Sequence, residues 1–191
     1  MIRIAVVGPP GAGKSHLAER LHMLTGLPLI DLDDIYWGPA WSRPGDAEWA
    51  RRHNEAISQP EWIIAGNFQP QIADRLSRAT HVVIVNPGVA VCLSRLVYRT
   101  LSIYAGNTTA LPQQIRPHGR WSAGRGLARI AHIALRYRSV GLPVTLATAH
   151  ARQLSIIRVG VRVNSRAIVG TLPQDPRKHP TNQHLPGTTD R

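Results

Sequence analysis

The sequence predicts an α/β fold in which a five-stranded parallel sheet carries helices on both faces. Two observations favour this fold. Short apolar runs alternate with segments of helical spacing along the chain, as in a parallel sheet with helical crossovers. A glycine-rich turn lies between the first apolar run and the first helical segment. With 191 residues the chain is long enough for one such domain and little more.

The elements follow from hydrophobic spacing and from turn residues. Strands are expected at residues 2–7, 27–32, 62–65, 81–85 and 154–159. Helices are expected at residues 14–24, 46–59, 70–78, 88–104, 127–139 and 143–152, with a short helix at 165–172. Asp46 is expected to cap the second helix, and residues 33–45 to form a loop or a short helix. Residues 1–172 then make one domain with a mobile lid at about 105–125, and residues 173–191 a disordered tail.

The charge distribution is uneven. The formal net charge is +12, and nine of the eleven carboxylates lie in residues 1–74. Residues 75–174 contain fourteen arginines and no Asp or Glu. One interpretation is a surface for polyanions, nucleotide phosphates first and nucleic acid second. The other is a compositional bias. Under either, a carboxylate that binds metal or accepts a proton must come from the first 74 residues, or from Asp175 or Asp190.

Other bulk features bear on location. Cys92 is the only cysteine, so no internal disulfide can form, and a reducing cytoplasmic setting is expected. No apolar run approaches the about 18 residues of a membrane span. Met1 leads directly into an apolar strand, so no signal peptide is expected.

Residues 8–15 match the phosphate-loop pattern G-x-x-x-x-G-K-[ST]. Glycines let the backbone curl so that N–H groups point at phosphate oxygens, and the following helix adds its positive N-terminal end. The lysine would reach the β- and γ-phosphates, and the serine hydroxyl would bind magnesium. The expected nucleotide-binding residues are Gly8, Gly11, Ala12, Gly13, Lys14, Ser15 and His16. For His16 an ordinary position in the first helical turn is the alternative.

Three carboxylates, Asp31, Asp33 and Asp34, follow the second predicted strand, at the sheet edge where ligands bind in such folds. A carboxylate there could accept a proton from an acceptor hydroxyl or hold magnesium through water. Strand alternation would put Asp31 and Asp33 on one side if the strand reached Asp33. Asp33 is the preferred candidate for both roles, and turn capping is the alternative for each aspartate.

The motifs together resemble a known family. The phosphate loop, the segment Asp31-Leu32-Asp33-Asp34-Ile35-Tyr36-Trp37 with Trp41, and Trp62-Ile63-Ile64-Ala65-Gly66-Asn67-Phe68 occur in this order. They are similar to the small P-loop kinases related to adenylate kinase, in the subgroup labelled DNA topology-modulation proteins. The resemblance covers about residues 1–172. It implies a three-layer P-loop NTPase fold, ATP binding and an arginine-bearing lid.

The resemblance also implies roles for residues. Arg95 and Arg99 occupy the helix on which related kinases present phosphate-binding arginines, and Gly66 and Asn67 match the end of the third strand near the acceptor. A solvated basic face is the alternative for the two arginines. Ala65 departs from the pattern, because relatives commonly carry an acidic residue there. The lid is matched only loosely, so the resemblance does not decide which of Arg116, Arg120 and Arg125 meets the phosphates.

The expected function is ATP binding with Mg²⁺ and transfer of the γ-phosphoryl to an unidentified small-molecule or nucleotide acceptor. Lys14, Asp33, Arg95 and Arg99 are the expected catalytic residues, and Ser15 and Asp33 the expected magnesium ligands. Two alternatives remain. One is an ATP-binding protein with little turnover, suggested by Ala65. The other is a nucleic-acid binder regulated by nucleotide, with strongly salt-dependent affinity.

Overall fold

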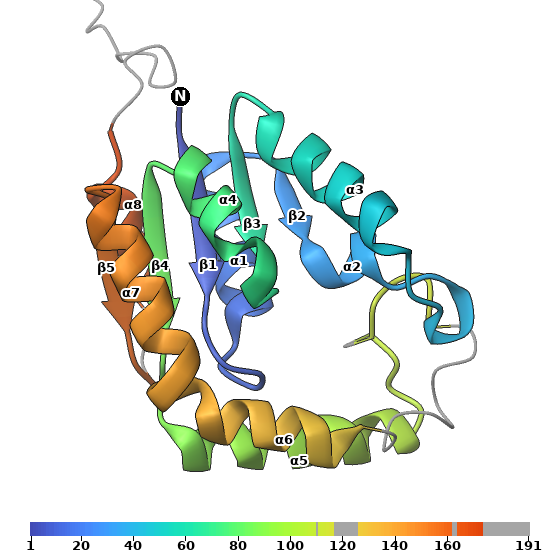
Figure 1. Cartoon of the computed structure of the whole chain (residues 1–191). Helices are drawn as coiled ribbons and strands as arrows, with labels where there is room; N and C mark the ends of the chain where they lie inside the picture. The colour runs from blue at the N-terminus through green and yellow to red at the C-terminus, as the bar shows by residue number, and fades with distance from the viewer. Residues whose placement is uncertain (110, 117–125, 162–163, 174–191) are drawn as a thin grey trace, which may run out of the picture.

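The computed structural model describes residues 1–109, 111–116, 126–161 and 164–173. Its centre is one sheet of five parallel strands in the order β2-β3-β1-β4-β5 (Figure 1). The strands are β1 (Arg3–Val7), β2 (Leu29–Asp31), β3 (Trp62–Ala65), β4 (His81–Val85) and β5 (Ser155–Val159). All of β3 and β4 is buried, as expected for the uninterrupted apolar runs of a parallel sheet covered on both faces.

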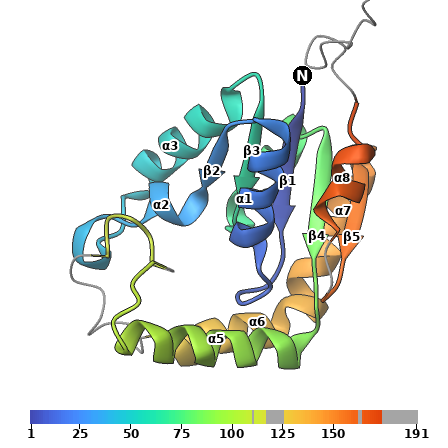
Figure 2. The same ribbon diagram turned by 180° about the vertical axis from the view of Figure 1, so that it is seen from behind.

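Helices cover both faces of the sheet. One face carries α1 (Lys14–Thr25) and α8 (Ser165–Gly170), which lie in front of it in Figure 2. The other carries α3 (Asp46–Ser58), α4 (Ile72–Arg78) and α7 (Leu142–Ala151), which lie in front in Figure 1. Each layer buries its own hydrophobic cluster against the strands. The predicted three-layer α/β architecture is therefore confirmed.

The helices α5 (Val89–Tyr104) and α6 (Leu127–Arg136) run side by side past the carboxyl ends of the strands (Figures 1 and 2). They face the edge at which parallel sheets bind ligands. Within the described residues, no helix combines the length and the apolar character needed to cross a membrane.

The second strand is shorter than predicted. β2 ends at Asp31, and the chain turns at once into α2 (Leu32–Tyr36), because the Asp31 side chain accepts a hydrogen bond from the Asp33 N–H at 3.0 Å and caps the helix. The argument that strand alternation puts Asp31 and Asp33 on one side is therefore wrong, since Asp33 lies in a helical turn. A short 3₁₀ turn, η1 (Pro39–Trp41), follows within the predicted loop.

Three further boundaries differ. Helix α3 begins at Asp46 with Gly45 as its cap, so Asp46 supplies negative charge to the first turn instead of capping it. The predicted helix at 70–78 is preceded by a 3₁₀ turn, η2 (Gln69–Gln71), and starts at Ile72. The predicted break after residue 139 is absent, because the π-helical turn η4 (Tyr137–Gly141) joins α6 to α7.

Candidate functional site

The phosphate loop connects β1 to α1, which starts at Lys14. The Lys14 ammonium donates to the Pro9 carbonyl at 3.1 Å, and the Ala12 N–H donates to the same oxygen at 3.2 Å. These two bonds curl the loop back on itself. The curl gathers the start of α1, with its positive end, at the carboxyl edge of the sheet, which is the arrangement that binds phosphate.

Gly11 is required by close packing. It adopts a φ of +78°, and a Cβ atom added there would collide with the Cys92 carbonyl oxygen on α5. Only glycine combines that backbone conformation with that approach. The loop is thus packed directly against α5.

Arg95 completes this contact. Its Nη1 donates to the Ala12 carbonyl at 2.9 Å, so α5 grips the phosphate loop through a charged hydrogen bond. Arg95 therefore lies in the site, as predicted from the sequence, but its hydrogen bond is to the backbone of the phosphate loop. Arg99 lies one turn further along α5 and interacts electrostatically with both Asp33 and Lys14.

Ser15 and Asp31 are joined directly. The Ser15 hydroxyl donates to Asp31 Oδ2 at 2.7 Å, while Asp31 Oδ1 accepts from the Asp33 N–H. One carboxylate therefore links the start of α1 to the start of α2. Ala65 at the end of β3 pairs with Asp31 at the end of β2. The carboxylate that β3 lacks at this position is therefore present on the neighbouring strand.

Asp33 has a perturbed acidity. It is reached by solvent, yet surrounding protein desolvates its carboxylate and raises its pKa, and repulsion from Asp31 raises that pKa further. Lys14 and Arg99 oppose both effects. Burial also lowers the pKa of Lys14, against the attraction of Asp33 and Asp31. Acidic and basic groups from four segments thus converge, a combination typical of functional sites.

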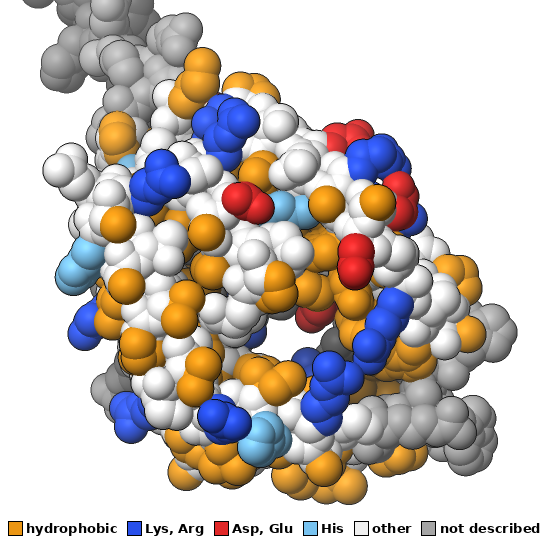
Figure 3. Space-filling view, viewed as in Figure 1, with side chains coloured by type: hydrophobic (Ala, Val, Ile, Leu, Met, Phe, Trp, Pro, Cys, Tyr) orange, Lys and Arg blue, Asp and Glu red, His pale blue; other side chains and the backbone are white. Residues whose placement is uncertain are grey.

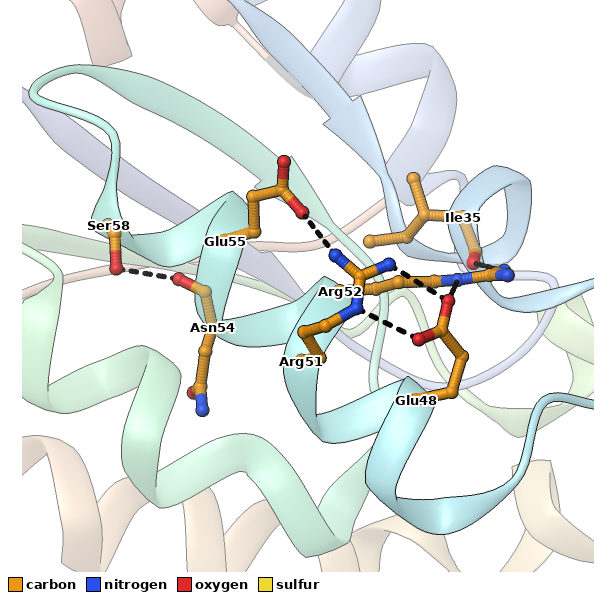
Figure 4. A network of polar contacts seen from close by, with 7 residues as sticks. All are labelled: Ile35, Glu48, Arg51, Arg52, Asn54, Glu55 and Ser58. Carbon is orange, nitrogen blue, oxygen red and sulfur yellow. Dashed lines mark hydrogen bonds and ion pairs between the residues drawn. The ribbon is translucent and has the colours of Figure 1, made fainter.

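A cluster of aromatic rings packs against α2. Tyr36 on α2 lies 4.9 Å from Trp49 and 4.7 Å from Phe68 between ring centroids. Trp49 is almost fully buried, so these rings pack mainly on one another. Arg52 of α3 adds a polar tie, because it donates to Glu48 at 2.7 Å and to the Ile35 carbonyl at 3.1 Å (Figure 4).

The first part of the predicted lid is docked against α2 and the residues that follow it. The Gln113 N–H donates to Asp34 Oδ1 at 2.9 Å. A small apolar cluster of Ile103, Leu111 and Ile115 packs against the rings of Trp37 and Trp41. Arg116 donates to the carbonyls of Leu111 and Thr109 in its own segment. Arg120 and Arg125 lie outside the described residues, as does the predicted tail from residue 174.

The space-filling view shows the resulting shape. A hollow lies between the carboxyl edge of the sheet and the α5–α6 pair, with Lys and Arg side chains along its rim and an acidic side chain at its edge (Figure 3). Contacts and electrostatic interactions bring Lys14, Ser15, Asp33, Arg95 and Arg99 together around the phosphate loop. His16 is exposed in the first turn of α1.

The absence of an acidic residue at Ala65 left Asp33 and Asp31 as candidates for its role, and the sequence favoured Asp33. In the structure, Asp31 is the carboxylate that contacts Ser15. With Ala65 at the end of β3, the nearest carboxylate available to the serine is the one at the end of β2.

Comparison with known proteins identifies the fold. No protein-family profile matches the sequence. No curated protein matches it either. Among solved structures, shikimate kinase from Acinetobacter baumannii in complex with shikimate is similar with a TM-score of 0.54 and 19% identity over 89% of each chain. Shikimate kinase from Aquifex aeolicus has a TM-score of 0.50 and 15% identity, over 88% of this chain and 92% of its own.

These likenesses support the predicted three-layer P-loop NTPase fold. At such identities they show the fold alone. The resemblance to the DNA topology-modulation subgroup is not confirmed by them.

Proposed function

We propose that this chain is an ATP- and magnesium-dependent kinase that transfers the γ-phosphoryl group to a hydroxyl of a small molecule. The observation that carries the proposal is the convergence of Lys14, Ser15, Asp31, Asp33 and Arg99 at the mouth of a phosphate loop. Cation, hydroxyl and carboxylates are the groups phosphoryl transfer needs, because its catalysis is mostly positioning and neutralisation of charge. The likeness to shikimate kinases supports a small-molecule acceptor.

The donor set suits magnesium. Ser15 and Asp31 offer a hydroxyl and a carboxylate oxygen already 2.7 Å apart. Magnesium typically takes one or two such protein ligands and completes its octahedron with water and phosphate oxygens. Asp33, which the sequence also predicts as a magnesium ligand, lies next to this pair and would contact the ion through a water molecule. Bound there, the ion would neutralise phosphate charge.

The chain's own residues then have distinct tasks. Lys14 leaves the Pro9 carbonyl to bind β- and γ-phosphate oxygens, and the N–H groups of residues 11–15 surround the phosphates. Arg99, which interacts electrostatically with Asp33 and Lys14, would neutralise negative charge on the transferred group. Asp33 orients the acceptor hydroxyl and accepts its proton, a role that its raised pKa favours because the carboxylate becomes more basic. Arg95 keeps the loop in place through the Ala12 carbonyl.

The test starts with Lys14→Ala, with the exposed Arg20→Ala on the same helix as control. Titration calorimetry with ATP and Mg²⁺ should give affinity weakened about 10- to 100-fold for Lys14→Ala, the value of charge-assisted hydrogen bonds, and unchanged for the control. Product formation is then followed over nucleosides, nucleotides, sugars and shikimate. Equal ATP affinity in Lys14→Ala and wild type would refute the binding site.

Ala65 favours a second candidate, an ATP-binding protein with little turnover. The same experiment separates the two. Tight ATP binding that depends on Lys14, with no transfer to any acceptor of the panel, would support the second candidate and contradict the kinase. Phosphorylated product that needs both Mg²⁺ and Lys14 would support the kinase.

A further inference from the structure

Arg75 is a buried cation with no role in the site described above. It lies in α4, and its side chain is fully shielded from solvent. Its Nη2 donates to the Gly66 carbonyl at 3.1 Å and to the Asn67 carbonyl at 2.9 Å. These carbonyls belong to the turn that follows β3, at the same sheet edge as the phosphate loop.

No carboxylate balances this guanidinium among the residues that the structure describes. Nε and Nη1 have no hydrogen-bond partner there, and neither has Nε2 of the neighbouring His53. Burial lowers the pKa of Arg75 to about 10, so the side chain stays charged at neutral pH. A buried charge with so few partners is costly, and an apolar side chain of similar size would be expected to stabilise the fold better. A specific task for the guanidinium would account for it.

The turn that Arg75 holds is strained. Phe68 adopts a φ of +29°, a conformation that residues with a side chain rarely take. Gly66 has a φ of +137°, and a Cβ atom there would lie 2.8 Å from Cβ of Leu32. Strained backbone persists only where surrounding contacts hold it, and it gathers at functional sites.

The turn at residues 66–68 supports α2. Gly66 contacts Leu32, the first residue of α2, and the ring of Phe68 packs on that of Tyr36, the last. Both ends of this single-turn helix therefore rest on residues 66–68. Asp33 lies between these two contacts, so a shift of the turn would move its carboxylate.

We propose that Arg75 is a positioning residue: by bridging the Gly66 and Asn67 carbonyls it fixes the turn at residues 66–68, and through it α2 and the Asp33 carboxylate that faces the acceptor. The link to the acceptor rests on the proposed function. The link from Arg75 to the turn and α2 does not.

The test compares Arg75→Met and Arg75→Lys with Arg78→Met, an exposed arginine on the same helix. Methionine keeps much of the volume and removes the charge, while lysine keeps the charge without the planar fork. Urea denaturation first establishes which variants are folded. Hydrogen exchange is then measured for the amides of residues 66–71 and 32–36, with those of β1 and β4 as internal reference.

We expect Arg75→Met to raise the amide exchange rates of both segments at least about tenfold, because hydrogen bonds from a charged group are lost. The exchange rates of β1 and β4 should not change. Once the substrate panel has identified an acceptor, Arg75→Met should raise the KM for that acceptor or lower kcat about tenfold. Its affinity for ATP should stay within about twofold of wild type. Arg75→Lys should recover part of both effects, and Arg78→Met should behave as wild type. Should Arg75→Met be unfolded, the Lys variant carries the comparison.

Two results would overturn the proposal. One is exchange that rises equally in the reference strands, or only outside residues 66–71 and 32–36, because Arg75 would then support the fold in general. The other is loss of ATP affinity as large as the loss in transfer. If no acceptor is found, the proposed kinase function fails, and the exchange of residues 32–36 still decides whether Arg75 controls α2.

Discussion

Asp33 shows at the scale of one residue how this site trades stability for chemistry. Desolvation and the repulsion of Asp31 raise its pKa above the ordinary 3.8, so its charged form is disfavoured in the folded protein. The folded state therefore binds this proton more tightly than the unfolded state, and stability falls as pH rises through the folded pKa. At neutral pH, the charged carboxylate is a net cost to folding.

Asp33→Asn should accordingly stabilise the protein at pH 7 while abolishing phosphoryl transfer. The gain should vanish below pH 3.8, where the carboxyl is protonated in both states. Urea denaturation at several pH values measures it, with the exposed Glu19→Gln as control. A less stable Asp33→Asn protein at pH 7 would mean that Lys14 and Arg99 outweigh desolvation.

His53 carries a second pH dependence of opposite sign. Burial and the nearby Arg75 lower its pKa from 6.5 to about 4, with Asp74 opposing, so the folded protein keeps this ring neutral. Stability should fall as pH drops from 6.5 to about 4, by at most about 3 kcal/mol. His53→Phe should remove that part of the slope in urea denaturation, whereas the exposed His150→Gln should not. An unchanged slope in His53→Phe would assign it to other groups.

At the scale of elements, the segment after α5 and the helix α2 are fastened together. The Asp34 carboxylate accepts the Gln113 N–H, and Leu111 and Ile115 pack against Trp37 and Trp41. α2 therefore touches four other parts of the site: α1 through Asp31 and Ser15, α3 through Arg52, the turn after β3, and this segment. A displacement of α2 would be felt by all of them.

Removing the polar part of this fastening should loosen the segment selectively. In Asp34→Ala the Gln113 amide should exchange with solvent about tenfold faster, because one hydrogen bond to a charged group is lost. Hydrogen exchange followed by mass spectrometry or NMR measures this, with Asp46→Ala as the matched control. If the apolar cluster alone holds the segment, exchange at residues 111–116 will stay at the wild-type rate.

At the scale of the whole molecule, stability depends on the sheet and its two apolar layers. Ile64 lies in β3 with no solvent exposure, between Ala5 of β1 and Ile30 of β2. Its side chain belongs to the cluster on the α3–α4–α7 face. The site residues lie at the end of this layered core, so the core can be weakened without touching them.

Ile64→Ala should destabilise the fold by about 2–5 kcal/mol through lost transfer energy and a residual cavity. Val161→Ala, at a side chain that is 56% exposed, should change stability by less than about 0.5 kcal/mol. Urea denaturation gives both values, and ATP titration of the folded Ile64→Ala protein should match wild type. A matching loss of ATP affinity would show that core and site are coupled.

The sequence by itself determined the order of the elements and the identity of the phosphate loop. Apolar spacing is a local property, so it located all five strands, and the pattern around Lys14 and Ser15 needs only eight consecutive residues. The charge distribution also limited the carboxylates to the first 74 residues and the tail. The end of β2 was misjudged, because a single capping bond from Asp31 to the Asp33 N–H replaced strand by helix.

Only the tertiary structure decided which residues meet. Asp31 and Ser15 are 16 positions apart, Ala12 and Arg95 are 83, and Asp34 and Gln113 are 79. No periodicity reports such contacts, because they depend on how strands order themselves in the sheet and how helices cross its edge. Arg75 is the clearest case: in sequence it is one more basic residue of α4, and only burial beneath the Gly66–Asn67 carbonyls distinguishes it from the exposed Arg78.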